Sequence, residues 1–319
     1  MRLPVPIVNL ALRLSVRRAL AGLDDLAVMR ENFDRRVGRF FRVPRDVSFE
    51  TVDIAVDSRW LRVGIAVPRE RERGRVILYL HGGGFVAGSP RTHGPFAAKL
   101  ARAARAWALI PDYRLTPEHP FPAAVEDTLD AYRYLIERGH APGAIAVAGD
   151  SAGGGLAAAL LLAAAEAGLP QPGCLVAYSP WVDMRETADS LTENAAQDDM
   201  LPVERMPEVV EAYLDGTPRT EPLASPVLGR FTDPPPALIF ASEREILRDD
   251  ALALAAKLEA AGGEVTLRLR AGLPHAWPVF AGWMRAADHA LAESAAFLRR
   301  HLAPARGAEP EPPAADPAG

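Results

Sequence analysis

A serine stands between two glycines in residues 149–153, which read Gly-Asp-Ser-Ala-Gly. These five residues directly follow the apolar run 144–148 and directly precede an alanine-rich stretch. A strand before and a helix after are the setting of a nucleophile elbow, a sharp turn that exposes a serine hydroxyl. The glycines lack the Cβ atoms that would clash in this turn, and the helix N-terminus favours developing negative charge. The pattern predicts that Ser151 is the nucleophile of an acyl transfer, rather than part of a loop without chemistry.

Three consecutive glycines, at positions 82–84, follow His81 and the apolar run 76–80. Backbone N–H groups in such a turn can face a ligand, because no side chain stands in the way. In acyl transfer they stabilise the tetrahedral oxyanion, and one such donor is worth about 3–4 kcal/mol. A merely structural turn is the alternative, but the serine elbow downstream favours an anion-stabilising turn. We predict a structural, hydrogen-bonding role for His81, because it belongs to a turn that must hold still.

A nucleophilic serine needs a base, and with an elbow of this type the chain order is serine, acid, histidine. Of the seven histidines, only His275, His289 and His301 follow Ser151. His289 and His301 belong to the last amphipathic stretch, where a solvated or packed histidine is the usual outcome. His275 lies in a loop after the last apolar run, from which an imidazole can reach a neighbouring strand end. We therefore predict that His275 is the base.

The acid should lie in the loop that follows the apolar run 237–241. Its candidates are Glu243, Glu245, Asp249 and Asp250. Asp249 and Asp250 directly precede an expected helix, 251–261, and suit its N-cap and first turn. Glu245 has no such competing structural task and can hold the imidazole tautomer and stabilise the imidazolium. We favour Glu245 over Asp249.

Short continuous apolar runs alternate with helical stretches over most of the chain. This alternation is typical of an α/β fold with a parallel sheet buried on both faces. The expected strands are 76–80, 106–110, 144–148, 174–178, 237–241 and 265–269, and the expected helices are 95–105, 123–138, 152–167, 251–261 and 286–301. Upstream, the alternating runs 47–56 and 60–67 predict an antiparallel hairpin.

Two segments outside this alternation carry helical patterns. Residues 1–45 are expected to form two short helices, and the long connection 183–222 holds a helical stretch at 203–214. Together they could cover one end of the sheet, where long connections usually carry function. The Pro-, Ala- and Glu-rich tail 303–319 is expected to be disordered. The catalytic domain is then expected to span residues 46–302.

Composition narrows the function classes. The chain has 319 residues and a formal net charge of −5, which argues against nucleic acid as a partner. Its single cysteine, Cys174, cannot form an intramolecular disulfide and lies in an apolar run typical of a buried strand. No His/Cys spacing suggests a metal site, and the glycine runs do not form a dinucleotide fingerprint. We expect no cofactor and no metal.

The N-terminus contains an apolar stretch, residues 4–16, which Asn9 and Arg13 interrupt. It is too short to span a bilayer, and no small-residue cleavage site follows it cleanly. We expect an amphipathic helix without a stable membrane span, and a cytoplasmic protein. A peripheral membrane contact is the alternative.

Several motifs together resemble the hormone-sensitive-lipase-like branch of the α/β-hydrolases. Residues 81–85 read His-Gly-Gly-Gly-Phe, residues 149–154 read Gly-Asp-Ser-Ala-Gly-Gly, and residues 112–122 read Asp-Tyr-Arg-Leu-Thr-Pro-Glu-His-Pro-Phe-Pro. The resemblance continues through residues 179–183, 245–250 and Pro274-His275, and so covers roughly residues 74 to 300. It implies an α/β-hydrolase fold with a mostly parallel eight-stranded sheet flanked by helices, and a helical cap built from 1–45 and 183–222.

The resemblance also implies roles for individual groups. The N–H groups of Gly83, Gly84 and Ala152 would form the oxyanion hole. Many members carry Asp-Pro-Leu-x-Asp-Glu in the acid loop, whereas residues 245–250 read Glu-Ile-Leu-Arg-Asp-Asp, so Glu245 stands where the aspartate is usual. Many members form homodimers, so the resemblance also implies a possible homodimer of this chain. Residues 112–122 are expected to form a rigid, ion-paired loop through Arg114 and Glu118, with no chemical role.

The implied activity is that of a serine carboxylic ester hydrolase that acts on small to medium acyl esters through an acyl-enzyme intermediate. A lactonase or amidase with the same triad is one alternative, since the leaving group depends on the shape of the cap. A non-catalytic receptor is another, because plant gibberellin receptors resemble this family but lack the catalytic histidine. Ser151 and His275 are both present, which weighs against a receptor.

Overall fold

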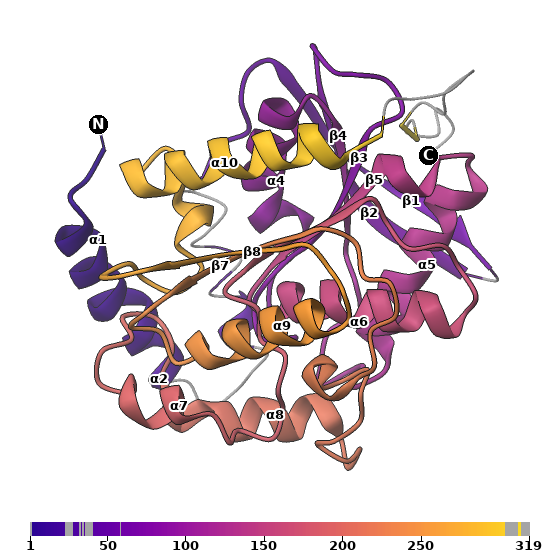
Figure 1. The fold of residues 1–319 in the computed structure, drawn as a ribbon. Helices are drawn as coiled ribbons and strands as arrows, with labels where there is room; N and C mark the ends of the chain where they lie inside the picture. Colours follow the sequence, from indigo (N-terminus) through magenta and orange to yellow (C-terminus); the bar gives the residue numbers. More distant parts are fainter. Residues whose placement is uncertain are drawn as a thin grey trace.

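The centre of the molecule is an eight-stranded sheet with the strand order β1-β2-β4-β3-β5-β6-β7-β8 (Figure 1). The computed structural model describes residues 2–22, 28–31, 33, 35, 41–57, 59–303 and 312–313. The strands are β1 (Val47–Val56), β2 (Arg59–Pro68), β3 (Val76–Leu80), β4 (Trp107–Pro111), β5 (Ile145–Asp150), β6 (Cys174–Tyr178), β7 (Ala237–Ser242) and β8 (Val265–Arg270). The first two strands pair antiparallel with each other, and β2 with β4, whereas the remaining pairs are parallel. The predicted hairpin and the mostly parallel eight-stranded sheet are confirmed.

The burial of each strand explains why it could be predicted from the pattern of apolar residues. Every residue of β3, β4, β5, β6 and β7 is buried, so these strands appear as continuous apolar runs. The outer strand β1 alternates between buried and exposed residues, as a half-buried strand does. Cys174 is buried in β6, where burial raises the pKa of its thiol to about 12. The prediction of a buried structural cysteine is confirmed.

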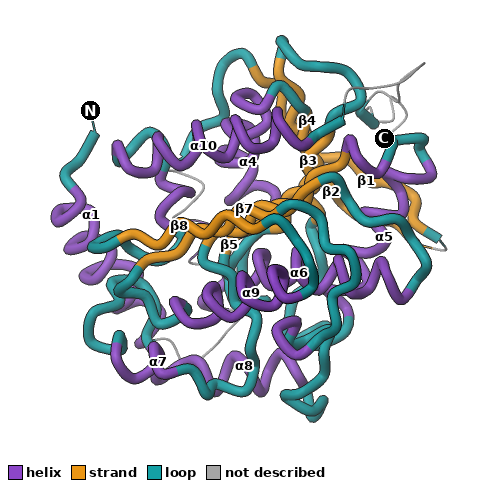
Figure 2. Tube along the Cα trace, in the orientation of Figure 1, coloured by secondary structure: helices purple, strands orange, loops and turns teal. Residues whose placement is uncertain are grey.

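Helices cover both faces of the sheet (Figures 1 and 2). They are α1 (Val5–Leu12), α2 (Arg18–Ala21), α4 (Pro90–Ala104), α5 (Ala123–Glu137), α6 (Ala152–Glu166), α7 (Asp189–Glu193), α8 (Met206–Leu214), α9 (Arg248–Ala260) and α10 (Arg285–His301), and a π-helical turn, Arg13–Arg17, joins α1 to α2. The helices α4 and α10 pack on one face, and α5, α6 and α9 pack on the other. Each face has its own apolar core.

Helix α4, the first helix after β3, begins earlier than the sequence predicts. We expect it to start at Pro95, but α4 begins at Pro90 and contains Pro95 in its interior. Ser89 caps it: the Ser89 side chain accepts from the N–H of Thr92, and the Thr92 hydroxyl accepts from the N–H of Ser89. Pro90 then takes the first helical position, where a missing N–H costs no hydrogen bond. This reciprocal cap outweighs the tendency of Pro95 to end a helix.

The N-terminal helices lie beside the long connection 183–222. Arg13 donates to the backbone carbonyl of Ala196, and Arg17 donates to that of Ala195 at 2.9 Å. Much of the tail 303–319, whose disorder is predicted, lies outside the described residues. Within the described part of the chain, no helix combines the length and the apolar character needed to cross a bilayer.

Candidate active site

Ser151 occupies a strained turn between β5 and α6. Its φ of 54° lies in the left-handed region, and its N–H donates to the carbonyl of Tyr178 at 2.8 Å. A Cβ atom on Gly153 would lie 2.1 Å from the carbonyl oxygen of Leu80, which explains why the turn needs a glycine there. Ser151 is 9% exposed, and its hydroxyl hydrogen-bonds to none of the described residues. The turn therefore leaves the Ser151 hydroxyl free of bonds to the described part of the chain.

The glycine turn after β3 lies directly beside this elbow. Gly83 and Gly84 have φ values of 120° and 63°, which favour glycine, and a Cβ atom on Gly83 would lie 2.2 Å from the carbonyl oxygen of Ala87. The N–H groups of Gly83 and Gly84 donate to none of the described residues. Ala152 is the first residue of α6, where a helical N–H has no partner within the helix. The three N–H groups singled out in the sequence are thus available as donors.

His275 and Glu245 contact each other in the interior. The Nδ1 atom of His275 lies 2.7 Å from Oε2 of Glu245, and both residues are buried. The other oxygen of Glu245 accepts from the N–H of Ser242 at 2.8 Å, which fixes the carboxylate. Burial alone would lower the pKa of His275, but the hydrogen bond and charge of Glu245 raise it above the ordinary value of 6.5. With Nδ1 bonded to the carboxylate, Nε2 is the nitrogen that can accept a proton.

The end of β6 joins the loop of His275 to the elbow of Ser151. Ser179 directly follows Tyr178, the residue whose carbonyl accepts from the N–H of Ser151. The Ser179 hydroxyl accepts from the N–H of Ala276 at 2.9 Å, next to His275. Because β5, β6, β7 and β8 are parallel neighbours, their carboxyl ends meet at one edge of the sheet. The three predicted side chains follow β5, β7 and β8 at that edge.

The other acid candidates bond elsewhere. Asp249 accepts from the N–H of Ser190 at 2.8 Å and pairs with the side chain of Arg248. Asp250 accepts from the N–H groups of Val182 and Asp183, and burial raises its pKa to about 8.

The predicted N-cap is wrong, because α9 begins at Arg248 and both aspartates lie inside its first turn. Glu243 is exposed. Of the four candidates, only Glu245 contacts His275.

Three other histidines and the loop 112–122 take no part in the contact between His275 and Glu245. His81 stacks on Tyr113 with ring centroids 4.1 Å apart, and burial lowers its pKa to about 3, so it stays neutral. His289 is exposed on α10, and His301 packs on a phenylalanine of the same helix. The ion pairs predicted for loop 112–122 reach outside the loop: Arg114 pairs with Glu126 and Asp127 of α5, and Glu118 pairs with Arg30.

Asp150, which directly precedes the nucleophile, received no role from the sequence. Its Oδ1 accepts from the Tyr79 hydroxyl at 2.7 Å and from the N–H of Gly82 at 3.2 Å. Its Oδ2 lies 3.5 Å from Nε2 of His93. Burial alone would raise the pKa of Asp150, but His93 and Tyr79 keep it below the usual range. This carboxylate ties the glycine turn to the elbow, and its place beside the serine was the only available signal.

Asp198 is a second buried carboxylate that the sequence did not single out. Its Oδ1 accepts from the N–H groups of Met200 and Leu201, both at 2.8 Å. Its Oδ2 accepts from the N–H of Ile246 at 3.0 Å, next to Glu245. Asp198 thus anchors the acid loop to the long connection across 48 residues of sequence. No spacing in the sequence signals such a contact.

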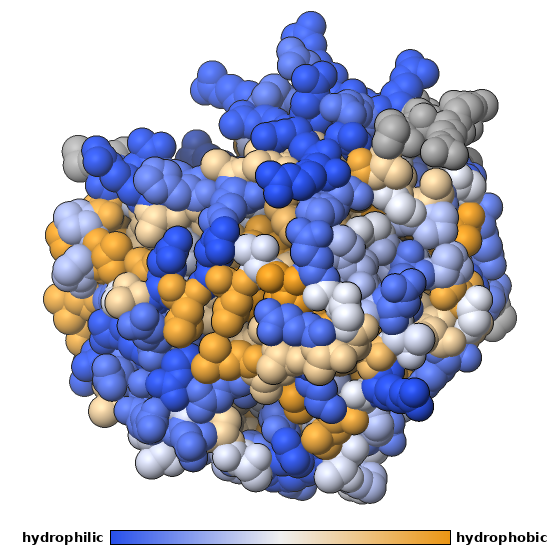
Figure 3. All heavy atoms as spheres, viewed as in Figure 1, coloured by the Kyte–Doolittle hydropathy of each residue, from blue (hydrophilic) through white to orange (hydrophobic). Residues whose placement is uncertain are grey.

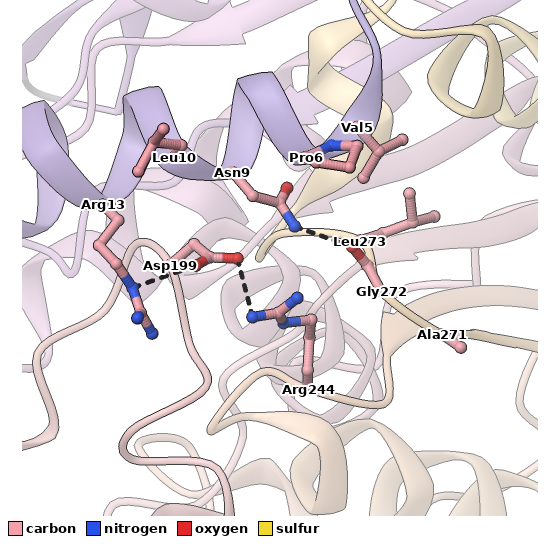
Figure 4. Close-up of a pocket in the computed structure, with 10 residues that line it drawn as sticks. All are labelled: Val5, Pro6, Asn9, Leu10, Arg13, Asp199, Arg244, Ala271, Gly272 and Leu273. Carbon is pink, nitrogen blue, oxygen red and sulfur yellow. Dashed lines mark hydrogen bonds and ion pairs between the residues drawn. The ribbon is translucent and has the colours of Figure 1, made fainter.

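A pocket of about 530 Å³ lies between α1 and the segments that carry Asp199, Arg244 and residues 271–273 (Figure 4). It is lined by Val5, Pro6, Asn9, Leu10, Arg13, Asp199, Arg244, Ala271, Gly272 and Leu273. None of the three proposed catalytic side chains lines it, so it is not the reaction chamber. Among the described residues, no group of three or more His, Cys, Asp and Glu side chains is arranged to hold a metal ion.

Comparison with known proteins gives concordant matches. A family model described as alpha/beta hydrolase fold matches residues 77–279. An acetyl-hydrolase of Streptomyces hygroscopicus is 42% identical over 229 residues, which are 72% of this chain and 77% of the relative. A crystal structure of an esterase from the bacterial hormone-sensitive lipase family is 36% identical, has a TM-score of 0.87, and matches over 95% of this chain and 100% of its own. The esterase EstE5, soaked with p-nitrophenyl butyrate, is 35% identical, with a TM-score of 0.86 over 93% and 98% of the two chains.

Proposed function

Because this chain belongs to the α/β-hydrolase fold family, in its hormone-sensitive-lipase-like branch, we propose that Ser151, His275 and Glu245 are the catalytic triad of a carboxylesterase. The observation that carries the proposal is the buried 2.7 Å contact between His275 and Glu245, at the sheet edge where the Ser151 elbow stands. Two features support the proposal: the Ser151 hydroxyl is bonded to none of the described residues, and the contact with Glu245 fixes the tautomer of His275.

The first half of the reaction is acylation. The Ser151 hydroxyl attacks the ester carbonyl carbon while Nε2 of His275 takes its proton. Glu245 accepts from Nδ1–H and stabilises the imidazolium that forms. The N–H groups of Gly83, Gly84 and Ala152 donate to the oxyanion of the tetrahedral intermediate. The C–O bond to the alcohol then breaks, the alcohol leaves with the proton from His275, and Ser151 carries the acyl group.

The second half is hydrolysis of the acyl-enzyme. His275, neutral again, takes a proton from a water molecule as the water attacks the acyl carbon. The same three N–H groups stabilise the second oxyanion. The bond to the Ser151 oxygen breaks, and His275 returns the proton to that oxygen. The carboxylic acid leaves, and no group beyond the chain and water is needed to balance the reaction.

The substrate class follows from the chemistry of the triad and from relatives. We propose esters of small to medium acyl groups, which agrees with an acetyl-hydrolase among the relatives and with the p-nitrophenyl butyrate applied to EstE5. Segments 1–45 and 183–222 are proposed as the cap above a catalytic domain of residues 46–302. The homodimer and the cytoplasmic location stay predictions. A lactone or amide substrate would use the same steps with another leaving group.

The direct test is hydrolysis combined with serine labelling. The purified protein should release p-nitrophenol from p-nitrophenyl acetate and butyrate. Phenylmethylsulfonyl fluoride should inhibit this release, and the fraction of activity lost should equal the fraction of protein that carries one sulfonyl adduct. Peptide mass spectrometry should locate that adduct on Ser151. An adduct on another residue, or full activity in protein fully labelled at Ser151, would refute the proposed nucleophile.

The pH profile should report the base. His275 works only when neutral, and its pKa is raised above 6.5 by Glu245, so kcat/KM should fall as the pH drops through that raised pKa. The profile is measured with p-nitrophenyl butyrate at the isosbestic wavelength of p-nitrophenol. Glu245→Gln removes the charge that raises the pKa, so the acid limb of its residual activity should move to lower pH. A rate that stays constant down to about pH 5 would contradict a buried histidine base.

A further inference from the structure

The N-terminal helix α1 and the turn after it expose a row of large apolar side chains. Ile7, Leu10 and Leu14 are 53%, 58% and 56% exposed. Their spacing of three and four residues places them on one face of the helix. In the space-filling view, apolar residues gather at the edge of the molecule where Figure 1 draws α1 (Figure 3). We call these three residues the α1 stripe.

The opposite face of α1 is fixed to the protein. Val8 and Leu12 are buried in the apolar core beside α4 and α10. The buried Asn9 donates from Nδ2 to the carbonyl of Gly272 at 2.9 Å, as Figure 4 shows. The helix is therefore held with the α1 stripe turned to solvent. Since the opposite face of α1 already packs on the apolar core, the stripe is not needed for that packing.

The charged residues of the segment that carries the stripe all have one sign. Residues 2–22 contain four arginines, Arg2, Arg13, Arg17 and Arg18, and no aspartate or glutamate, although the whole chain has a net charge of −5. Arg2 pairs with Asp288, and Arg13 shares Asp199 with Arg244, which leaves two cations around one carboxylate (Figure 4). Arg17 donates to backbone carbonyls and adds its charge to those of Arg13 and Arg244 around the single carboxylate of Asp199. Arg18 is exposed.

We propose that the α1 stripe docks on an anionic lipid surface. A helix that lies in a membrane interface buries its apolar face at the boundary of the acyl chains and holds arginines at the level of the lipid phosphates. The α1 stripe supplies the apolar face, and residues 2–22, which contain arginines but no aspartate or glutamate, supply the cations. A second copy of the chain is a poorer occupant, because two such faces would bring their arginines together. The proposal does not depend on the proposed hydrolysis.

The test is co-sedimentation with vesicles of ether-linked lipids, which an esterase cannot cleave. The protein should sediment with vesicles that contain phosphatidylglycerol, much less with pure phosphatidylcholine, and less in high salt. The triple variant Ile7→Gln/Leu10→Gln/Leu14→Gln keeps helix-forming residues and should bind at least about tenfold more weakly. Its circular dichroism spectrum and thermal unfolding midpoint should match those of the unsubstituted protein, because all three side chains are exposed.

Trp60→Gln is the matched control, since Trp60 is 72% exposed but lies on β2, outside the stripe. It should bind vesicles like the unsubstituted protein. The proposal is overturned if the unsubstituted protein stays in the supernatant or if the triple variant binds equally well. It is also overturned if light scattering finds a dimer that the triple substitution dissociates, because the stripe then contacts a second copy of the chain.

Discussion

Replacing Ser151 by alanine is expected to lower kcat for p-nitrophenyl butyrate by about 10⁶-fold, since the loss of a triad nucleophile removes the acyl-enzyme route altogether. The residual rate should reflect only binding and the oxyanion donors. The substitution should leave the fold intact, because the Ser151 hydroxyl bonds to none of the described residues and its removal leaves no described group without a partner. Steady-state rates on the purified variant, with thermal unfolding measured in parallel, check both expectations.

A matched control separates this loss from any general effect of a serine substitution. Ser15 is exposed, and its hydroxyl bonds only to the carbonyl of Ala11, one turn earlier in the N-terminal helix. Ser15→Ala should keep full activity. If Ser151→Ala hydrolyses the ester as fast as the unsubstituted protein, Ser151 is not the nucleophile and the acyl-enzyme mechanism fails with it.

The fold could be predicted because burial leaves a direct trace in the sequence. Strands buried on both faces, such as β3 and residues 145–148 of β5, hold mainly apolar residues, so their runs stand out from the helices between them. The ends of helices were less predictable, since they depend on single caps. The bond between Ser89 and Thr92 begins α4 five residues before the apolar pattern does.

Some residues of the candidate site could be predicted from the sequence and others could not. Ser151 stood out because the geometry of its turn demands glycines at fixed positions, and His275 because the chain order restricts the choice. The sequence assigned no role to the buried carboxylates Asp150 and Asp198, because each ties its loop to a remote segment by accepting an N–H group from it. Hydrogen-bond acceptors of this kind have no required spacing. Only the folded chain can reveal which N–H groups they meet.

The choice of acid is the point where sequence reasoning left two candidates, and substitutions can decide between them. In Glu245→Gln, one amide oxygen must serve two neighbours. If it accepts from the N–H of Ser242, the amide NH₂ faces Nδ1 of His275 and forces the proton onto Nε2, so the ring cannot accept the serine proton. If the amide is reversed, its NH₂ meets the N–H of Ser242, and two donors oppose each other.

Glu245→Gln should therefore lower kcat by about 10⁴-fold while KM changes little, because the wrong tautomer disables the base without altering the substrate site. Asp249→Asn is the matched control: its amide oxygen can still accept from the N–H of Ser190, and only a partly exposed pair with Arg248 is lost. We expect its kcat to stay within a few-fold of that of the unsubstituted enzyme. The opposite ranking, with Asp249→Asn crippled and Glu245→Gln active, would transfer the role of acid to Asp249 and would require the buried contact between Glu245 and His275 to be merely structural.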